Sequence, residues 1–199
     1  IDYPVLKEIN PRIIMCSISG FGQSGPYSER ISFDVLAQAM SGLMSITGYP
    51  DGPPTRVGTS LGDVNAAVHA AFAMMTALWY REKTGVGQYI DVSMQETMIS
   101  ILEGGIVRWT IGKELLTPIG SMNPHEAPMA AFRCKDGYII IATVGDEHWQ
   151  RFCRAISRPD WAADPGYRTK RQRWEKKYIL QEEIEKWTSS RTVKEVGEI

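Results

Sequence analysis

One aspartate stands where a carboxylate could do chemistry, at the start of a long apolar segment. The run Gly58-Thr-Ser-Leu-Gly-Asp63 places Asp63 directly after a glycine and just before the alanine-rich stretch 64–77. A carboxylate in the first turn of a helix is kept ionised by the local dipole and the backbone amides. An ionised carboxylate flanked by glycine is suited to nucleophilic attack on an acyl group.

The same spacing also allows a purely structural role for Asp63. Ser60 as N-cap with an acidic residue three positions later fits the capping-box pattern, and Asp63 could also cap the helix directly. Spacing alone favours capping. The two roles are compatible, however, because a capping carboxylate also remains ionised.

Other residues that support catalysis or metal binding are few and scattered. The three histidines share no metal-ligand spacing and the three cysteines form no C-x-x-C pair, so we expect neither a metal centre nor a disulfide framework. We expect His69 to be packed inside a buried helix and His148 to lie at the surface. His125 is in a predicted loop and is a candidate to contact a substrate.

Charge and hydropathy narrow the range of partners. The chain has 22 basic and 23 acidic residues among 199 and a formal net charge of -1. This balance does not provide the basic face that nucleic acid or an anionic membrane surface requires. The apolar stretch 64–80 is shorter than the roughly 20 residues that span a bilayer, and no signal peptide is recognisable. We therefore expect a cytoplasmic protein without nucleic-acid or membrane partners.

The elements that would position Asp63 alternate between strand and helix. The apolar, β-branched run 12–19 ends at Gly20, which is typical of a strand buried on both faces of a parallel sheet. The next predicted elements are helix 33–46, loop 48–54, helix 63–83, strand 88–94 and helix 95–109. Helix 63–83 is apolar nearly all round and has cationic residues before its terminating glycine, so we expect it to be buried. The alternation indicates an α/β fold.

The sequence pattern changes after Gly112. Residues 115–128 show little periodicity and predict a crossing segment or a substrate loop. The clearest hairpin follows, and the further predictions are strands 129–133 and 138–144, amphipathic helices 146–156 and 179–188, and a solvated charged surface over 168–186. We therefore predict a change of domain near residue 113.

Six short motifs in order along the chain make a specific resemblance to a known family. They are Asn10-Pro-Arg-Ile-Ile14, Ser17-Ile-Ser-Gly-Phe-Gly-Gln-Ser-Gly-Pro26, Phe33-Asp-Val-Leu-Ala-Gln-Ala-Met-Ser-Gly42, Asp51-Gly-Pro-Pro54, Gly62-Asp63 and Arg81-Glu-Lys-Thr-Gly-Val-Gly-Gln88. In this order they resemble the class III CoA-transferases, also called the CaiB/BaiF family, which include formyl-CoA transferase. The match is continuous over residues 10–96 and weaker to 161, as in an internal fragment of such an enzyme.

The resemblance implies an α/β fold in an interlocked homodimer. Residues 1–112 correspond to the Rossmann-like part of the large CoA-transferase domain, and residues 113–199 to a linker and a small α+β domain. The implied reaction moves CoA from an acyl-CoA donor to a carboxylic acid acceptor, with CoA thioesters as substrates and no bound cofactor. Asp63 matches the family nucleophile, which forms a mixed anhydride and then an aspartyl-CoA thioester.

The resemblance also implies substrate contacts. Family members bind CoA through the segment before the second helix, which corresponds to Ile31, Ser32, Phe33 and Asp34. Geometry alone favours another role for Asp34, as N-cap of a helix that begins at Val35. A mobile, often glycine-rich loop over the family active site corresponds to residues 120–126, where Asn123 and His125 are available to a substrate. This loop departs from a pure glycine run.

Two other functions stay open. α-Methylacyl-CoA racemases of the same superfamily use the equivalent of Asp63 as one of two opposed bases. Their second base is a histidine directly before the acid that matches Asp34, and this chain has Phe33 there, which disfavours racemisation. The other alternative is a non-catalytic partner subunit or a fragment that supports folding only, because the family's N-terminal third has no match in the 199 residues.

Overall fold

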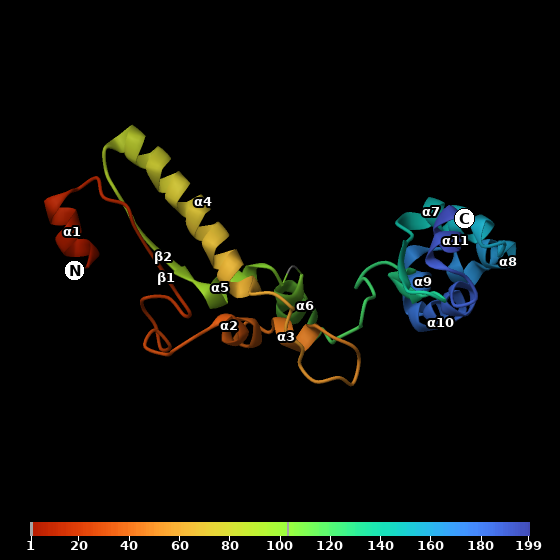
Figure 1. The fold of residues 1–199 in the computed structure, drawn as a ribbon. Coiled ribbons are helices and arrows are strands. Elements are labelled where there is room, and N and C mark those ends of the chain that lie inside the picture. The colour runs from red at the N-terminus through yellow and green to blue at the C-terminus, as the bar shows by residue number, and fades with distance from the viewer. Residues whose placement is uncertain (1, 103) are drawn as a thin grey trace. The chain divides into compact units, whose positions relative to one another are not determined.

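The chain divides into two compact units in a computed structural model that describes residues 2–102 and 104–199 (Figure 1). The units are Ile1–Pro118 and Ile119–Ile199. The first unit contains Asp63, and the second contains Asn123 and His125. The division falls slightly after the change of domain predicted near residue 113.

The first unit is built on a parallel strand pair joined by a long helix. β1 (Met15–Ser19) pairs in parallel with β2 (Tyr89–Ser93), and Met15 lies opposite Tyr89. The helices of this unit are α1 (Tyr3–Ile9), α2 (Asp34–Met40), α3 (Leu43–Ile46), α4 (Leu61–Thr84), α5 (Met94–Ser100) and α6 (Gly105–Gly112). α4 runs alongside both strands and also packs on α2 and α5 (Figure 1). Parallel strands need a long crossover connection, and the helices α2, α3 and α4 between β1 and β2 provide it. The predicted alternation of strand and helix is therefore confirmed.

Three predicted elements of this unit differ in detail. β1 is not buried on both faces, because Ile18 is 50% exposed. The predicted helix 33–46 is two helices, since Gly42 between α2 and α3 takes a positive φ of 92°, a conformation that interrupts a helix. The predicted helix 95–109 is also two helices, α5 and α6, and Glu103 between them lies outside the described residues.

α4 has nearly the predicted limits but not the predicted burial. It has 24 residues and ends at Gly85, which adopts the left-handed conformation and donates its N–H to the Arg81 carbonyl at 2.8 Å. The buried residues of α4 are all small: Gly62, Ala66, Ala70 and Ala77. Its exposed large apolar residues include Val64, Val68, Phe72, Met75 and Trp79. His69, which we expected in the core, is also exposed.

The packing of α4 has a simple physical cause. Its small residues let α2 and α5 approach closely, so its alanine face is buried and its large apolar side chains face outward. By length and composition α4 is also sufficient to cross a membrane, contrary to the expectation that the apolar stretch is too short. The apolar composition of a helix therefore does not establish that the helix is buried.

Close packing of the backbone beside β1 and β2 depends on Gly87. Its N–H donates to the Pro11 carbonyl at 2.8 Å, and a Cβ at this position would overlap the Ile13 carbonyl oxygen. We expect Gly87→Ala to destabilise the first unit by about 1–3 kcal/mol, the usual cost of overpacking. Denaturant unfolding followed by circular dichroism measures this effect. Gly58→Ala is the matched control, because no atom beyond the neighbouring residues of the chain lies within 4 Å of a Cβ there. Equal stabilities for the two variants would contradict the role of Gly87.

The second unit is a hairpin covered by helices. β3 (Met129–Arg133) and β4 (Tyr138–Ala142) pair antiparallel, as predicted. The helices are α7 (Gly145–Ala155), α8 (Pro159–Ala163), the 3-10 helix η1 (Pro165–Tyr167), α9 (Lys170–Glu175), α10 (Lys177–Thr188) and α11 (Val193–Glu198). α10 packs on β3 and α11 on β4. The core includes Phe132, Trp149, Trp161, Leu180 and Ile184, whereas His148 on α7 is exposed, as predicted.

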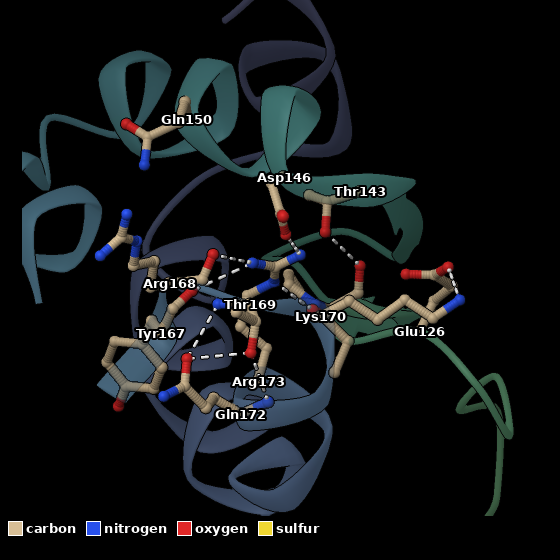
Figure 2. A network of polar contacts seen from close by, with 12 residues as sticks. Glu126, Thr143, Asp146, Gln150, Tyr167, Arg168, Thr169, Lys170, Gln172 and Arg173 are labelled. Atoms are coloured by element: carbon tan, nitrogen blue, oxygen red, sulfur yellow. Dashed lines mark hydrogen bonds and ion pairs between the residues drawn. The ribbon is translucent and has the colours of Figure 1, made fainter. Parts of the chain in front are cut away.

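Arg173 joins several segments of the second unit (Figure 2). Its side chain is fully buried, and its Nη2 atom pairs with the Asp146 carboxylate at 2.8 Å. It also donates to the carbonyls of Ala127 at 3.2 Å and Tyr167 at 3.0 Å. The guanidinium lies over the Trp149 ring, 5.4 Å from its centroid. The predicted solvated surface over residues 168–186 therefore contains a buried cation that connects α9 to α7 and to the loop before β3.

Candidate active site

Asp63 lies in the first turn of α4 with its side chain exposed. It is the third residue of the helix, and Ser60 occupies the N-cap position. Within the part of the chain that the structure describes, the Asp63 carboxylate has no hydrogen-bond or ion-pair partner. The N-terminal end of a helix favours a negative charge. This carboxylate is therefore available to react with a ligand.

The capping box predicted from Ser60 and Asp63 does not form. The Ser60 side chain makes no capping hydrogen bond. Instead, the N–H of Gly62 donates to the Oδ1 atom of Asp34 at 2.7 Å. A carboxylate from α2 thus satisfies one of the unpaired N–H groups at the start of α4, and Asp63 is not required for that purpose.

Asp34 is buried between α2 and the start of α4. It is 8% exposed and is itself the first residue of α2, with Phe33 as N-cap, so it does not cap a helix that begins at Val35. Its carboxylate accepts hydrogen bonds from Nε2 of Gln38 at 3.0 and 2.9 Å. The missing side chain of Gly62 makes room for it, because a Cβ there would lie 3.2 Å from Oδ1 of Asp34. Asp34 therefore contacts the residue directly before Asp63.

The segment assigned to CoA by resemblance precedes α2 at the surface. Ile31 is 79% exposed and Phe33 is 67% exposed. Ser32 packs against Gly20, where a Cβ would overlap the serine side chain. Two apolar side chains thus face outward directly before the buried Asp34.

Asn123 and His125 lie in the loop before β3, in the second unit. Oδ1 of Asn123 accepts the backbone N–H groups of His125 at 2.8 Å and Glu126 at 3.1 Å. Such a side-chain turn restrains the local backbone. Glu126 also forms an ion pair with Lys170 at 2.7 Å, while His125 is exposed. This loop is therefore held by polar contacts on both sides of His125.

Gln38 and Arg56 are candidate site residues that sequence analysis missed. Gln38 is fully buried, and Nη2 of the half-exposed Arg56 lies 3.5 Å from Oδ2 of Asp34. The spacing of four residues between Asp34 and Gln38 on a helix could have suggested their contact. No pattern indicates Arg56, which follows a loop rich in proline and glycine.

Among the described residues, no group of three His, Cys, Asp or Glu side chains is arranged to hold a metal ion.

The first unit is thus a strand–helix–strand unit of an α/β protein, with an exposed carboxylate at the start of its long helix. Comparison with known proteins gives the family. The model of CoA-transferase family III matches residues 1–199. The chain belongs to this family.

Curated relatives are similar along almost the whole chain. A succinyl-CoA:mesaconate CoA-transferase of Haloarcula hispanica is 40% identical over 192 residues, which cover 94% of this chain and 48% of the relative. An acetyl-CoA:oxalate CoA-transferase of Acetobacter aceti is 38% identical over 93% of this chain and 48% of the relative. A formyl-CoA:oxalate CoA-transferase of Streptomyces coelicolor is 36% identical over 93% and 49%. The chain thus spans about half the length of these relatives.

Solved structures agree with this assignment. A CaiB/BaiF family protein from Brucella suis is 31% identical and superposes with a TM-score of 0.82, covering 98% of this chain and 52% of that protein. A Mycobacterium tuberculosis protein is 27% identical with a TM-score of 0.83, covering 97% of this chain and 51% of that protein. The mixed α/β fold is therefore that of the CaiB/BaiF family.

Proposed function

We propose that this chain carries the nucleophile of a class III CoA-transferase and that Asp63 is this nucleophile. The observation that carries the proposal is the exposed Asp63 carboxylate in the first turn of α4, without a partner among the described residues and directly after the tethered Gly62. An unpaired carboxylate in this position keeps its lone pairs available for attack on a carbonyl carbon.

The proposed reaction exchanges bonds of similar energy at Asp63. A carboxylate oxygen attacks the thioester carbonyl of the donor, the C–S bond breaks, and CoA thiolate leaves behind a mixed anhydride. The thiolate then attacks the Asp63 carbonyl carbon, releasing the donor acid and forming an aspartyl-CoA thioester. The acceptor carboxylate repeats both steps in reverse and restores Asp63. Backbone amides at glycine-rich turns are suitable donors for the oxyanions that form.

We propose dicarboxylic acids as the substrate class. The names of the three curated relatives described in the comparison each contain a free dicarboxylic acid, oxalate in two and mesaconate in the third, beside acetyl-CoA, formyl-CoA or succinyl-CoA. Each of these acids has a second carboxylate that a cation could bind. Arg56, next to Asp34 and half-exposed, is a candidate for that contact.

The remaining expectations extend this proposal. We propose that CoA binds at the surface along the segment Ile31, Ser32, Phe33 and Asp34, of which Asp34 is the buried residue. Asn123 and His125 are proposed to contact the acyl or acid substrate. We further propose an interlocked cytoplasmic homodimer without membrane or nucleic-acid partners. In this homodimer protein, and not lipid, covers the exposed large apolar side chains of α4, which include Val64, Val68, Phe72, Met75 and Trp79.

The alternatives make different measurable predictions. A racemase would exchange the α-proton of a branched acyl-CoA with deuterated water, and a transferase would not. Phe33, which carries no proton-transferring group, occupies the position of the second base. A non-catalytic subunit need not bind CoA, so calorimetric titration of the full-length protein with CoA distinguishes it from an enzyme.

Trapping of the covalent intermediate tests the proposal directly. We expect hydroxylamine, added during turnover of the full-length protein, to convert Asp63 to a hydroxamate that mass spectrometry of the peptide detects, because hydroxylamine attacks thioesters and anhydrides but not free carboxylates. The label should require acyl-CoA. A hydroxamate on another residue, or none during active turnover, would exclude Asp63 as the nucleophile.

A further inference from the structure

Gln38 is a fully buried amide that connects α2 to the segment leading into α4. Its Nε2 atom donates to both carboxylate oxygens of Asp34 and to the Thr59 carbonyl at 3.2 Å. Its Oε1 atom accepts the N–H of Val57 at 2.9 Å. Acceptors at one end of the amide and a donor at the other leave a single orientation that satisfies all of them.

These bonds hold the chain before Asp63 at three backbone groups. Gln38 binds the Val57 N–H and the Thr59 carbonyl, and Asp34 binds the Gly62 N–H. Residues 52–60 form no helix or strand, so regular backbone hydrogen bonding does not fix their path. The position of the first turn of α4 therefore depends on this buried pair from α2.

We propose that Gln38 is a positioning residue for Asp63 and acts through Asp34 and Gly62; this inference rests on the proposed function of Asp63 as nucleophile. The Gln38 amide donates to the buried carboxylate of Asp34 and so fixes its orientation, and that carboxylate in turn accepts the Gly62 N–H. Asp63 follows Gly62 directly, so a shift of this N–H moves the attacking carboxylate. Displacing a reacting group by about 1 Å can cost roughly 10²-fold in rate.

Few charged groups lie near the hydrogen-bonded side chains of Gln38 and Asp34 among the described residues. Arg56 contacts Asp34, with 3.5 Å between Nη2 and Oδ2. α4 and α5 pack on α2 and bring Asp63 and Glu96 within their first turns, both exposed, while α3 has no titratable residue. Asp34 is thus the carboxylate that Gln38 contacts directly.

Gln38→Glu provides a test that depends on pH. At high pH the new carboxylate faces that of Asp34, and the repulsion disrupts the contact with Gly62. Two carboxylates this close retain one proton to a higher pH than an isolated one. Once protonated, the introduced carboxyl group again donates a hydrogen bond to Asp34. We expect kcat of the full-length variant to fall by about 10–100-fold at pH 8 relative to wild type and to recover toward the wild-type value at pH 6, with KM for acyl-CoA little changed.

Two further variants complete the experiment. Gln38→Met keeps the approximate shape but no hydrogen bonds, so its loss of kcat should be similar at both pH values. Gln88→Glu makes the same change on an exposed side chain and should behave as wild type. Faster hydrogen exchange at the Gly62 amide in both Gln38 variants, measured by mass spectrometry, is the expected structural result and does not depend on activity.

The outcomes separate the inference from the function on which it rests. A kcat for Gln38→Glu equal to wild type at pH 8, a loss confined to KM, or an unchanged Gly62 exchange rate would overturn the positioning role. The proposed function is tested separately, on the wild-type protein. It fails if no Asp63 hydroxamate forms during turnover in the presence of hydroxylamine. Loss of kcat at pH 8 with recovery at pH 6 supports the positioning role.

Discussion

Replacing Asp63 by asparagine is expected to lower kcat for CoA transfer in the full-length protein by about 10⁶-fold, the scale seen when the covalent nucleophile of a protease is removed. Asparagine is close in size to aspartate but lacks the charge and nucleophilicity needed to form the anhydride. The side chain has no partner among the described residues, so the folded structure should be unaffected. Steady-state transfer between an acyl-CoA and a dicarboxylic acid, followed by chromatography of the CoA esters, measures the loss.

A matched variant tests whether the loss of activity comes from removing the proposed nucleophile or from removing any exposed negative charge. Asp51→Asn removes another exposed carboxylate, from the loop before α4, at a positive φ of 60° that asparagine tolerates. We expect normal transfer from this variant and no hydroxamate from Asp63→Asn. Transfer by Asp63→Asn within a few-fold of wild type would eliminate Asp63 as the nucleophile.

Replacing Arg173 by methionine is expected to destabilise the second unit by about 2–6 kcal/mol, from two buried carbonyls left unsatisfied at about 1–3 kcal/mol each, a large part of the stability of a small domain. Methionine fills part of the space but donates no hydrogen bond. The carbonyls of Ala127 and Tyr167 would then be left without their donor in the interior. Guanidinium chloride unfolding followed by tryptophan fluorescence measures the change, because Arg173 lies over Trp149.

The partner of Arg173 supplies the control for that experiment. The Asp146 side chain is 62% exposed, and its asparagine variant keeps an oxygen that accepts the hydrogen bond. We expect Asp146→Asn to cost less than Arg173→Met, because the asparagine oxygen still accepts the hydrogen bond and the other donor contacts of Arg173 remain. If Arg173→Met and Asp146→Asn unfolded at the same denaturant concentration, the buried carbonyl contacts would not be the source of the stability.

Local patterns were sufficient for most elements. The end of α4 at Gly85 and the β3–β4 hairpin both appeared where the pattern predicted them. Each depends on interactions within a few residues, such as a left-handed glycine or alternating apolar residues. The break at Gly42 was missed because apolar residues continue at helical spacing across it.

The sequence by itself determined the order of strands and helices, the position of Asp63 at the start of a long helix, and the family resemblance that the comparisons confirm. Only the tertiary structure decided that Asp34 binds Gly62, 28 residues away, that Arg173 is buried, and which face of α4 is packed. The physical reason is the separation along the sequence over which each kind of interaction acts. Helix and strand preferences act between near neighbours, whereas these contacts depend on how separate elements pack, which no local spacing encodes.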